Sequence, residues 1–173
     1  MNILEQFKNI TTFVFDIDGV LTDGKVMLLP GGEQVRSMSI KDGYALQLAI
    51  KKGYRVIVIS GALSEPVKIR LQKLGVTEVH MQVENKQTLL HHYMANHNLT
   101  REQVLYMGDD VPDLAVMSMA GIAACPADAC PDIIRISAYI SPFKGGEGCV
   151  RDIIEKVLKT RDHWSVISGL SAI

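Results

Sequence analysis

Short runs of apolar, β-favouring residues alternate along this chain with segments of helical spacing. The runs that read as buried strands are Thr12–Phe15, Arg55–Ile59, Val104–Met107 and residues 121–124. Each run ends at polar or turn-forming residues. The segments with the apolar spacing or the start and stop residues of helices are residues 44–53, 64–75 and 86–97. Residues 100–103 have capping-box spacing and would form a single turn. This alternation predicts an α/β fold, a Rossmann-like and mostly parallel sheet with flanking helices, in which active groups gather beyond the carboxyl ends of the strands.

Two segments depart from this alternation. Residues 24–40 read as a β-hairpin, with turn residues at positions 30–32 between two strand-like arms. The hairpin is too small to be a domain, and its apolar residues need another surface to cover them, which suggests a subunit contact. The last stretch, residues 160–173, is mildly apolar and poorly patterned, so we expect either a frayed end or a segment that docks on a neighbour.

Length and composition narrow the class of protein. A chain of 173 residues with 47% hydrophobic content has the size of one domain, which we expect to span residues 1–173. Its formal charge of −1 gives no global attraction to nucleic acid or to an anionic membrane. The apolar runs are too short to span a membrane and the N-terminus lacks a signal-peptide pattern, so we expect a soluble cytoplasmic protein. Cys125, Cys130 and Cys149 lack CxxC spacing and are expected to be reduced, buried thiols.

Two aspartates directly follow the first predicted strand. Asp16 and Asp18 stand two positions apart, with Gly19 after them to let the chain turn. In an extended segment such residues point to the same side, so both carboxylates can meet one cation, and hard oxygen ligands favour Mg²⁺. The pattern alone is equally explained by an ordinary turn, because Asp and Gly are common turn residues.

A second acidic group follows another predicted strand. Asp109, Asp110 and Asp113 come after Val104–Met107 and, in a parallel sheet, reach the same edge as Asp16 and Asp18. Two of the three, Asp110 and Asp113, can also be read as residues that favour a helix N-terminus. That reading does not explain why acidic residues from two strand ends converge without a matching basic cluster.

A phosphate group fits the residues at the ends of the other strands. Ser60, with Gly61 beside it, can offer a hydroxyl and backbone N–H groups to a phosphate oxygen. Lys86, at the start of a predicted helix, can supply a positive charge. Taken singly, Ser60 reads as a turn residue and Lys86 as a solvated lysine.

Together these motifs resemble those of the haloacid dehalogenase superfamily, in order and at sensible separations. More narrowly, three segments resemble the capless 3-deoxy-D-manno-octulosonate 8-phosphate phosphatases, and this similarity covers nearly the whole chain. The three segments are residues 18–24, residues 41–44, which include Lys41, Asp42 and Gly43, and residues 145–151.

The resemblance implies a mechanism. Asp16 would attack phosphorus and form an aspartyl-phosphate, and Asp18 would act as acid and then as base. Mg²⁺ would be bound by the Asp16 carboxylate, the Asp18 backbone carbonyl and Asp109, with Asp113 supporting them. Ser60, Gly61 and Lys86 would bind the phosphoryl group. The resemblance also implies a homotetramer without a cap domain, in which the hairpin and the glycine-rich segment near residue 146 close a neighbour's site.

The substrate implied is a phosphorylated 2-keto-3-deoxy sugar acid, the eight-carbon acid of lipopolysaccharide. Relatives that act on that acid often carry Arg where this chain has Ala62. A family member acts on a nine-carbon ketodeoxy sugar acid 9-phosphate of the KDN/sialic acid type, so the chain length of the substrate stays open. Arg70 matches a basic position of the family that can meet the substrate carboxylate, but it reads equally well as an exposed helical arginine.

Two other classes remain as alternatives. A receiver-like signalling module also holds Mg²⁺, Asp, Ser/Thr and Lys at the end of a parallel sheet, but it places the phosphorylated Asp after a middle strand. A structural oligomer with a vestigial site is hard to reconcile with every motif being intact.

Overall fold

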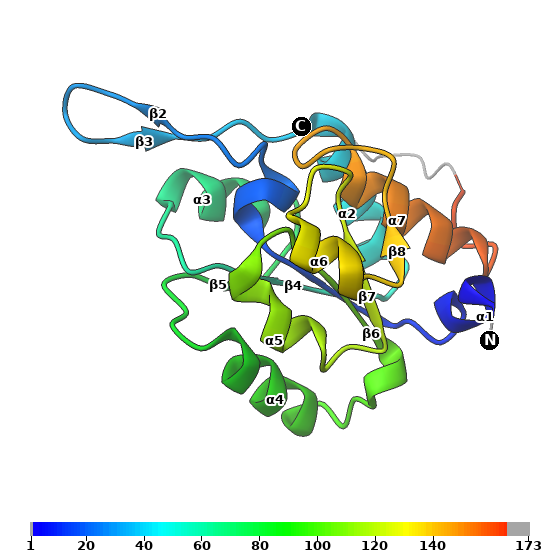
Figure 1. Ribbon diagram of the computed structural model, residues 1–173. Helices are drawn as coiled ribbons and strands as arrows, with labels where there is room; N and C mark the ends of the chain where they lie inside the picture. Colours follow the sequence, from blue (N-terminus) through cyan, green and yellow to red (C-terminus); the bar gives the residue numbers. More distant parts are fainter. Residues whose placement is uncertain (1, 166–173) are drawn as a thin grey trace.

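A computed structural model describes residues 2–165 of the chain, and it has the parallel α/β architecture that the sequence predicts (Figure 1). Six strands form one sheet in the order β5-β4-β1-β6-β7-β8, and every neighbouring pair is parallel. The sheet strands are β1 Thr12–Phe15, β4 Arg55–Ile59, β5 Glu78–His80, β6 Val104–Met107, β7 Ile122–Cys125 and β8 Tyr139–Ile140. The helices are α1 Ile3–Phe7, α2 Ile40–Lys51, α3 Glu65–Lys73, α4 Lys86–Asn96, α5 Leu114–Met117, α6 Pro131–Ile136 and α7 Cys149–Lys159.

Helices cover both faces of the sheet. Phe13 and Phe15 point to one face, where they pack with α2 and α7, whereas Val14 points to the other face, towards α4, α5 and α6. Strand β1 is buried along its whole length, and its register pairs Phe15 with both Val58 and Met107. The central strands are therefore apolar on both sides, which is why they appear in the sequence as continuous apolar runs.

Most of the elements expected from the sequence are present. The four predicted strands correspond to β1, β4, β6 and β7, the last shifted by one residue. The predicted helices correspond to α2, α3 and α4, although α2 begins at Ile40, earlier than expected. A single 3₁₀ turn covers Arg101–Gln103, and the Thr100 N–H donates to the Gln103 side chain at 2.9 Å, as capping-box spacing requires.

The predicted hairpin is also present. Strands β2 (Met27–Leu28) and β3 (Gln34–Val35) pair in antiparallel fashion and stand away from the body of the molecule (Figure 1). Met27 and Leu28 are 65% and 71% exposed. Residues 2–165 contain no inserted cap domain beyond this hairpin.

The first residues of the predicted C-terminal tail lie within the described part of the chain. Residues 160–165 fold back on their own chain, where the Trp164 ring meets Tyr44 at 6.2 Å between centroids and the Tyr54 hydroxyl lies 3.0 Å from His163 Nδ1. This part of the tail contacts its own chain beside Tyr44 and Tyr54, and docking on a neighbour stays a prediction. The rest of the predicted tail, residues 166–173, lies outside the described residues.

Two further findings concern cysteines and membranes. All three cysteines are free; Cys125 and Cys149 are buried as expected, and Cys130 is only partly buried. None of the helices in the described part of the chain is long and apolar enough to cross a membrane.

Candidate active site

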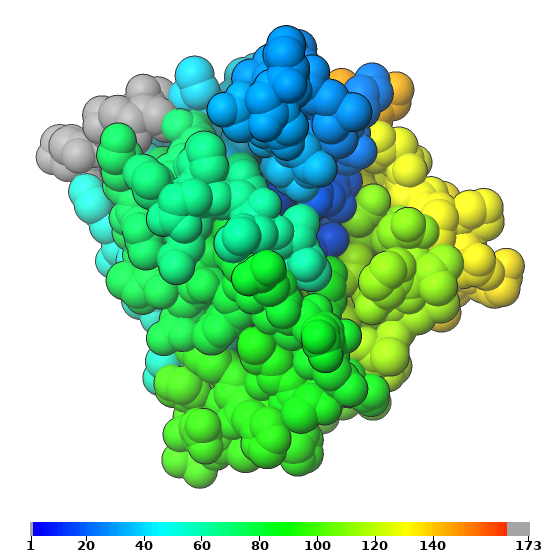
Figure 2. Space-filling model, turned by 90° about the vertical axis from the view of Figure 1, so that its left-hand side faces the viewer, coloured from blue at the N-terminus to red at the C-terminus, as the bar shows by residue number. Residues whose placement is uncertain are grey.

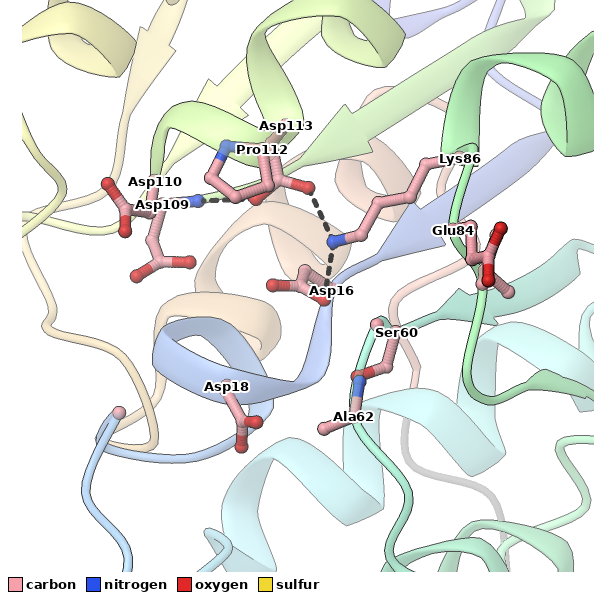
Figure 3. Close-up of a pocket in the computed structure, with 13 residues that line it drawn as sticks. Asp16, Asp18, Ser60, Ala62, Glu84, Lys86, Asp109, Asp110, Pro112 and Asp113 are labelled. Carbon is pink, nitrogen blue, oxygen red and sulfur yellow. Dashed lines mark hydrogen bonds and ion pairs between the residues drawn. The ribbon is translucent and has the colours of Figure 1, made fainter.

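The carboxyl ends of β1, β4 and β6 meet at one edge of the sheet and surround a pocket of about 380 Å³. Figure 2 shows the turn that follows β1 in a hollow between the hairpin and the loops that follow the other strands. The lining residues include Asp16, Asp18, Ser60, Gly61, Lys86, Asp109 and Asp113 (Figure 3). The parallel topology thus brings together residues that are almost a hundred positions apart in the sequence, as the strand-end argument predicts.

Lys86 links two of the carboxylates. Its ammonium lies 2.9 Å from Asp16 Oδ1 and 2.8 Å from Asp113 Oδ1, and its side chain is only 9% exposed. Asp113 is held in place by two further donors, the Tyr106 hydroxyl at 2.9 Å and the Asp109 backbone N–H at 3.2 Å. Lys86 is therefore not a solvated lysine. Tyr106 was not expected as part of the site, because an inward-facing tyrosine on a buried strand is usually a core residue.

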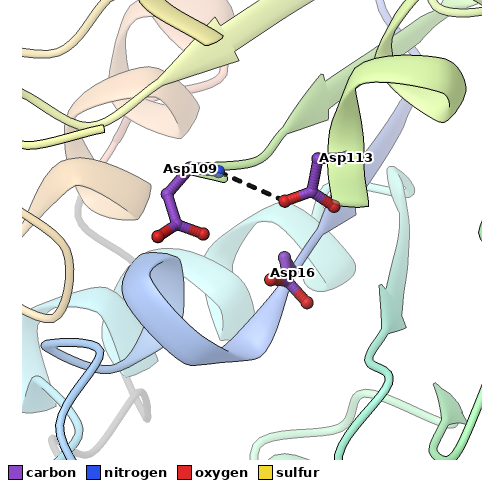
Figure 4. A group of neighbouring side chains, drawn as sticks. All are labelled: Asp16, Asp109 and Asp113. Atoms are coloured by element: carbon purple, nitrogen blue, oxygen red, sulfur yellow. Dashed lines mark hydrogen bonds between the residues drawn. The ribbon is translucent and has the colours of Figure 1, made fainter. Parts of the chain in front are cut away.

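Three carboxylates form a cluster that fits a divalent cation. Asp16, Asp109 and Asp113 each offer an oxygen within 4.8 Å of the others (Figure 4). A further sign of a missing ligand is the Oδ1 atom of Asp109, which is buried and has no hydrogen-bond partner. A buried acceptor without a partner is costly, and hard oxygen donors are the ligands that Mg²⁺ prefers. Both oxygens of Asp113 already accept hydrogen bonds, whereas Lys86 meets only Oδ1 of Asp16. Asp16 and Asp109 are therefore the side chains that could bind a cation.

Burial and mutual repulsion shift the pKa values of the carboxylates in the site. Burial raises the pKa of Asp16 to about 6, helped by the charge of Asp113 and opposed by Lys86. Burial also raises the pKa of Asp109 to about 7, with the charges of Asp16 and Asp113 adding to the effect. Burial alone would lower the pKa of Lys86, but the charges of Asp16 and Asp113 outweigh it and the pKa is raised. One ammonium thus does not neutralise the carboxylates, and a bound cation would complete the balance.

Glycine is required where the chain passes closest to these carboxylates. Gly19 has a φ of +88°, and a Cβ at this position would lie 1.9 Å from Asp109 Oδ2. A Cβ on Gly108 would lie 2.6 Å from the Asp113 side chain. The positive φ explains the DxDG pattern, because only glycine adopts that conformation without cost.

The carboxylate of Asp18 is placed differently from the sequence-based expectation. It is not part of the cluster formed by Asp16, Asp109 and Asp113, and Figure 3 shows it below Asp16, away from the other two. Asp18 keeps extended backbone angles (φ −74°, ψ 116°), but the chain turns at Gly19 (φ +88°), and the carboxylates of Asp16 and Asp18 do not meet at one centre as they would on one side of a strand. The Asp18 carboxylate instead accepts hydrogen bonds from Arg36, a residue that the sequence did not single out.

The loop after β4 forms the wall opposite the acidic cluster. Ser60 is buried, and its Oγ accepts a hydrogen bond from the Ala62 N–H at 3.1 Å. Ser60, Gly61 and Ala62 all line the pocket, as a phosphate-binding turn would.

The remaining candidates lie outside the pocket in this chain. Asp42 is 2% exposed, and its Oδ1 accepts a hydrogen bond from the Arg151 backbone N–H at 2.7 Å, at the start of α7. A Cβ on Gly43 would lie 3.2 Å from Leu74 Cδ2 and 3.4 Å from Arg70 Nη2, so the position is close to α3. Lys41 and Arg70 line separate hollows on either side of α2. Asp42 thus forms a contact between α2 and α7. Substrate binding by all four residues stays a prediction.

The chain is similar to known phosphatases along nearly its whole length. No family model matches the chain. The chain is 30% identical over 170 residues to the 3-deoxy-D-manno-octulosonate 8-phosphate phosphatase of Yersinia pestis. The aligned region covers 98% of this chain and 91% of the relative. The chain belongs to the 3-deoxy-D-manno-octulosonate 8-phosphate phosphatase family.

Solved structures of this phosphatase family share the fold. The crystal structure of the Yersinia pestis enzyme superposes with a TM-score of 0.93 at 30% identity, covering 97% of this chain and 91% of that one. A second structure is that of the enzyme of Moraxella catarrhalis in complex with a magnesium ion, a phosphate ion and KDO. It gives a TM-score of 0.90 at 29% identity, and the superposition covers 94% of this chain and 93% of that one. The resemblance noted in the sequence is therefore confirmed at the level of family and fold.

Proposed function

We propose that this chain is a magnesium-dependent phosphoric monoester hydrolase that acts on 3-deoxy-D-manno-octulosonate 8-phosphate, in the cytoplasmic synthesis of the lipopolysaccharide sugar. The observation that carries the proposal is the cluster of Asp16, Asp109 and Asp113 with Lys86 between two of them. The names of the relatives supply the sugar and the phosphate position.

Asp16 acts as the nucleophile in this proposal. One of its carboxylate oxygens forms a bond to phosphorus while the bond from phosphorus to the sugar oxygen breaks. Asp18 gives the departing oxygen a proton, and then takes a proton from the water that attacks the aspartyl-phosphate. That second attack releases inorganic phosphate and restores the Asp16 carboxylate, so atoms and charge balance over the two steps.

The surrounding residues bind and orient the phosphoryl group. Lys86 and the Ser60-Gly61 turn line the pocket with Asp16 and offer donors to the phosphoryl oxygens. Asp16 and Asp109, with the Asp18 backbone carbonyl, would hold Mg²⁺. When bound, the ion supplies positive charge that offsets the repulsion between the phosphate and the carboxylates. Asp113 orients Lys86 and the Asp109 backbone.

Steady-state phosphate release tests this assignment. We expect continued, Mg²⁺-dependent turnover that is abolished by Asp16→Asn and reduced about 10²-fold or more by Asp18→Asn. Asp132→Asn, on the surface of α6 where Asp132 pairs with Arg135, is the matched control and should leave the rate unchanged. Full turnover in Asp16→Asn would refute the nucleophile, and one phosphorylation per chain without further release would favour a receiver-like module.

A second substrate is favoured by one observation. Ala62 lines the pocket at the position where relatives that act on the eight-carbon acid often have Arg. A smaller side chain leaves room for a longer sugar, so a nine-carbon ketodeoxy sugar acid 9-phosphate is the second candidate. Assaying both esters side by side decides between them: the larger kcat/KM identifies the substrate, and equal rates on unrelated sugar phosphates would indicate a broad-specificity phosphatase.

We further propose a homotetramer in which neighbouring subunits complete each site. The exposed apolar side chains of the hairpin, Met27 and Leu28 among them, support this arrangement because they need a surface to cover them. Light scattering after gel filtration tests the proposal, since a monomeric mass would contradict it.

A further inference from the structure

The glycine-rich segment between β8 and α7 packs directly against the turn Ile17–Leu21, which follows the proposed nucleophile. The Gly146 N–H donates a hydrogen bond to the Val20 carbonyl at 2.9 Å. A Cβ on Gly145 would lie 2.0 Å from the carbonyl oxygen of Gly19, so there is no room for a side chain between the two backbones. Because close-packed segments transmit displacement, the glycine-rich segment helps to fix the turn.

The loop after β7 supports the other half of the proposed metal site. In this loop, residues 126–130, the Cys130 N–H donates a hydrogen bond to the backbone carbonyl of Asp109 at 2.9 Å. Asp109 follows β6 and carries the buried carboxylate oxygen that has no partner. The backbone of one proposed metal ligand is thus tied to the loop after β7.

Asp128 joins these two supports. Its Oδ1 accepts a hydrogen bond from the Gly145 N–H at 3.0 Å, so a side chain of the loop after β7 holds the glycine that touches the turn after β1. A second bond between the two segments, from the Ala127 N–H to the Phe143 carbonyl at 2.9 Å, involves only backbone atoms. Removing the Asp128 carboxylate therefore releases Gly145 without separating the two segments. Asp128 is exposed and is not among the residues that line the pocket.

We propose that Asp128 is a positioning residue that sets the spacing between the two halves of the magnesium site. The connection runs from Asp109 through the loop after β7 and Asp128 to Gly145, which contacts the turn that follows Asp16. Because ligand distances at a metal vary by only about 0.2 Å, a small change in this spacing weakens binding. The inference rests on the proposed function, because it takes Mg²⁺ as the ion that Asp16 and Asp109 share.

Binding of Mg²⁺ alone, without substrate, measures this role. For Asp128→Ala we expect the dissociation constant, obtained from the rise of Tm with Mg²⁺ concentration, to increase about 3- to 10-fold. This is less than the roughly 10- to 100-fold typical of residues that bond directly to a metal ligand, because Asp128 acts through one more contact. Asp128→Asn should bind Mg²⁺ as the wild type does, since its amide oxygen still accepts from the Gly145 N–H.

A charge control completes the comparison. Asp132→Ala removes an exposed carboxylate from the start of α6, close in sequence to Asp128, and should leave the dissociation constant unchanged. Equal weakening in Asp128→Ala and Asp128→Asn would overturn the proposal, because the lost charge would then be the cause. A lower Tm of metal-free Asp128→Ala with an unchanged constant would also overturn it and leave a structural contact alone.

Failure of this inference and failure of the proposed function give different results. A wild-type protein that binds no Mg²⁺ would overturn both. Mg²⁺-dependent turnover by the wild type, together with unaltered Mg²⁺ binding in Asp128→Ala, would overturn only the role of Asp128.

Discussion

Gly19→Ala tests the geometry of the proposed metal site without changing any polar group. The substitution places a Cβ 1.9 Å from Asp109 Oδ2 and 2.4 Å from its Cγ, both much closer than non-bonded atoms approach. Because the turn around Gly19 is buried, the Asp109 carboxylate is the group that must move, by about 1 Å. Metal ligands tolerate only ~0.2 Å of displacement, so we expect Asp109 to lose its place in the cluster with Asp16.

The expected magnitude has two parts. An L-residue at the φ of +88° found for Gly19 costs about 1–2 kcal/mol of folding free energy. That cost corresponds to a fall in Tm of roughly 2–8 °C for a chain of this size. A misplacement of about 1 Å at a reacting centre costs on the order of 10²-fold in rate. We therefore expect kcat/KM to fall about 10²-fold or more and the Mg²⁺ concentration for half-maximal activity to rise.

Gly53→Ala is the matched control. Gly53 has nearly the same φ, +84°, but a Cβ there meets nothing within 4 Å. Titrating Mg²⁺ in the phosphate-release assay, together with thermal unfolding of both variants, separates strain from displacement. Gly53→Ala should lose similar stability and keep full activity. If Gly19→Ala also kept its activity and its Mg²⁺ response, the close approach of Gly19 to Asp109 would have no part in the site.

Three further predictions concern charge. Mg²⁺ should raise Tm more at pH 8 than at pH 5.5, because Asp16 and Asp109, with pKa values of about 6 and 7, must lose protons to bind it; a gain independent of pH would contradict this. Lys86→Met should reduce kcat about 10²-fold and destabilise the metal-free protein by about 3 kcal/mol in urea unfolding, because it leaves buried carboxylates without their partner; unchanged stability would show that they do not need it. Burial raises the pKa of Asp42 from 3.8 to about 6, so its stabilising contribution is complete below pH 4 and is lost as the pH rises to 6. Asp42→Asn keeps an acceptor for the Arg151 N–H but does not titrate, so its free energy of unfolding should fall less between pH 4 and pH 7 than that of the wild type. An identical fall in both proteins would exclude Asp42 as the source of this pH dependence.

The central part of the fold could be predicted because its signal is local. Strands buried on both faces, such as Thr12–Phe15, are continuous apolar runs. The outer strands β5 and β8 lie at the edges of the sheet, are short, and contain exposed or polar residues, so no local pattern marks them. Helix α7 was not among the expected elements, although Val150, Ile153, Ile154, Val157 and Leu158 have helical spacing and are buried. The signal for α7 is therefore present in the sequence.

The acidic cluster of the site was also predictable, whereas its supporting contacts were not. Parallel topology alone places Asp16 beside Asp109, because both follow strands that end at the same edge. The pairing of Asp18 with Arg36 depends on how the hairpin folds back across the turn after β1, and nothing local encodes that path. The contact of Asp42 with α7 joins residues 109 positions apart and likewise has no local signal.

The covalent step at Asp16 is most directly tested by trapping it. The wild-type enzyme is quenched in acid during steady-state turnover with Mg²⁺ and 3-deoxy-D-manno-octulosonate 8-phosphate, and its peptides are mapped by mass spectrometry. The account predicts one phosphoryl group on the peptide that contains Asp16, converted to homoserine at that position by borohydride, and none in Asp16→Asn. A phosphoryl group on another residue, or continued turnover of Asp16→Asn, would contradict it.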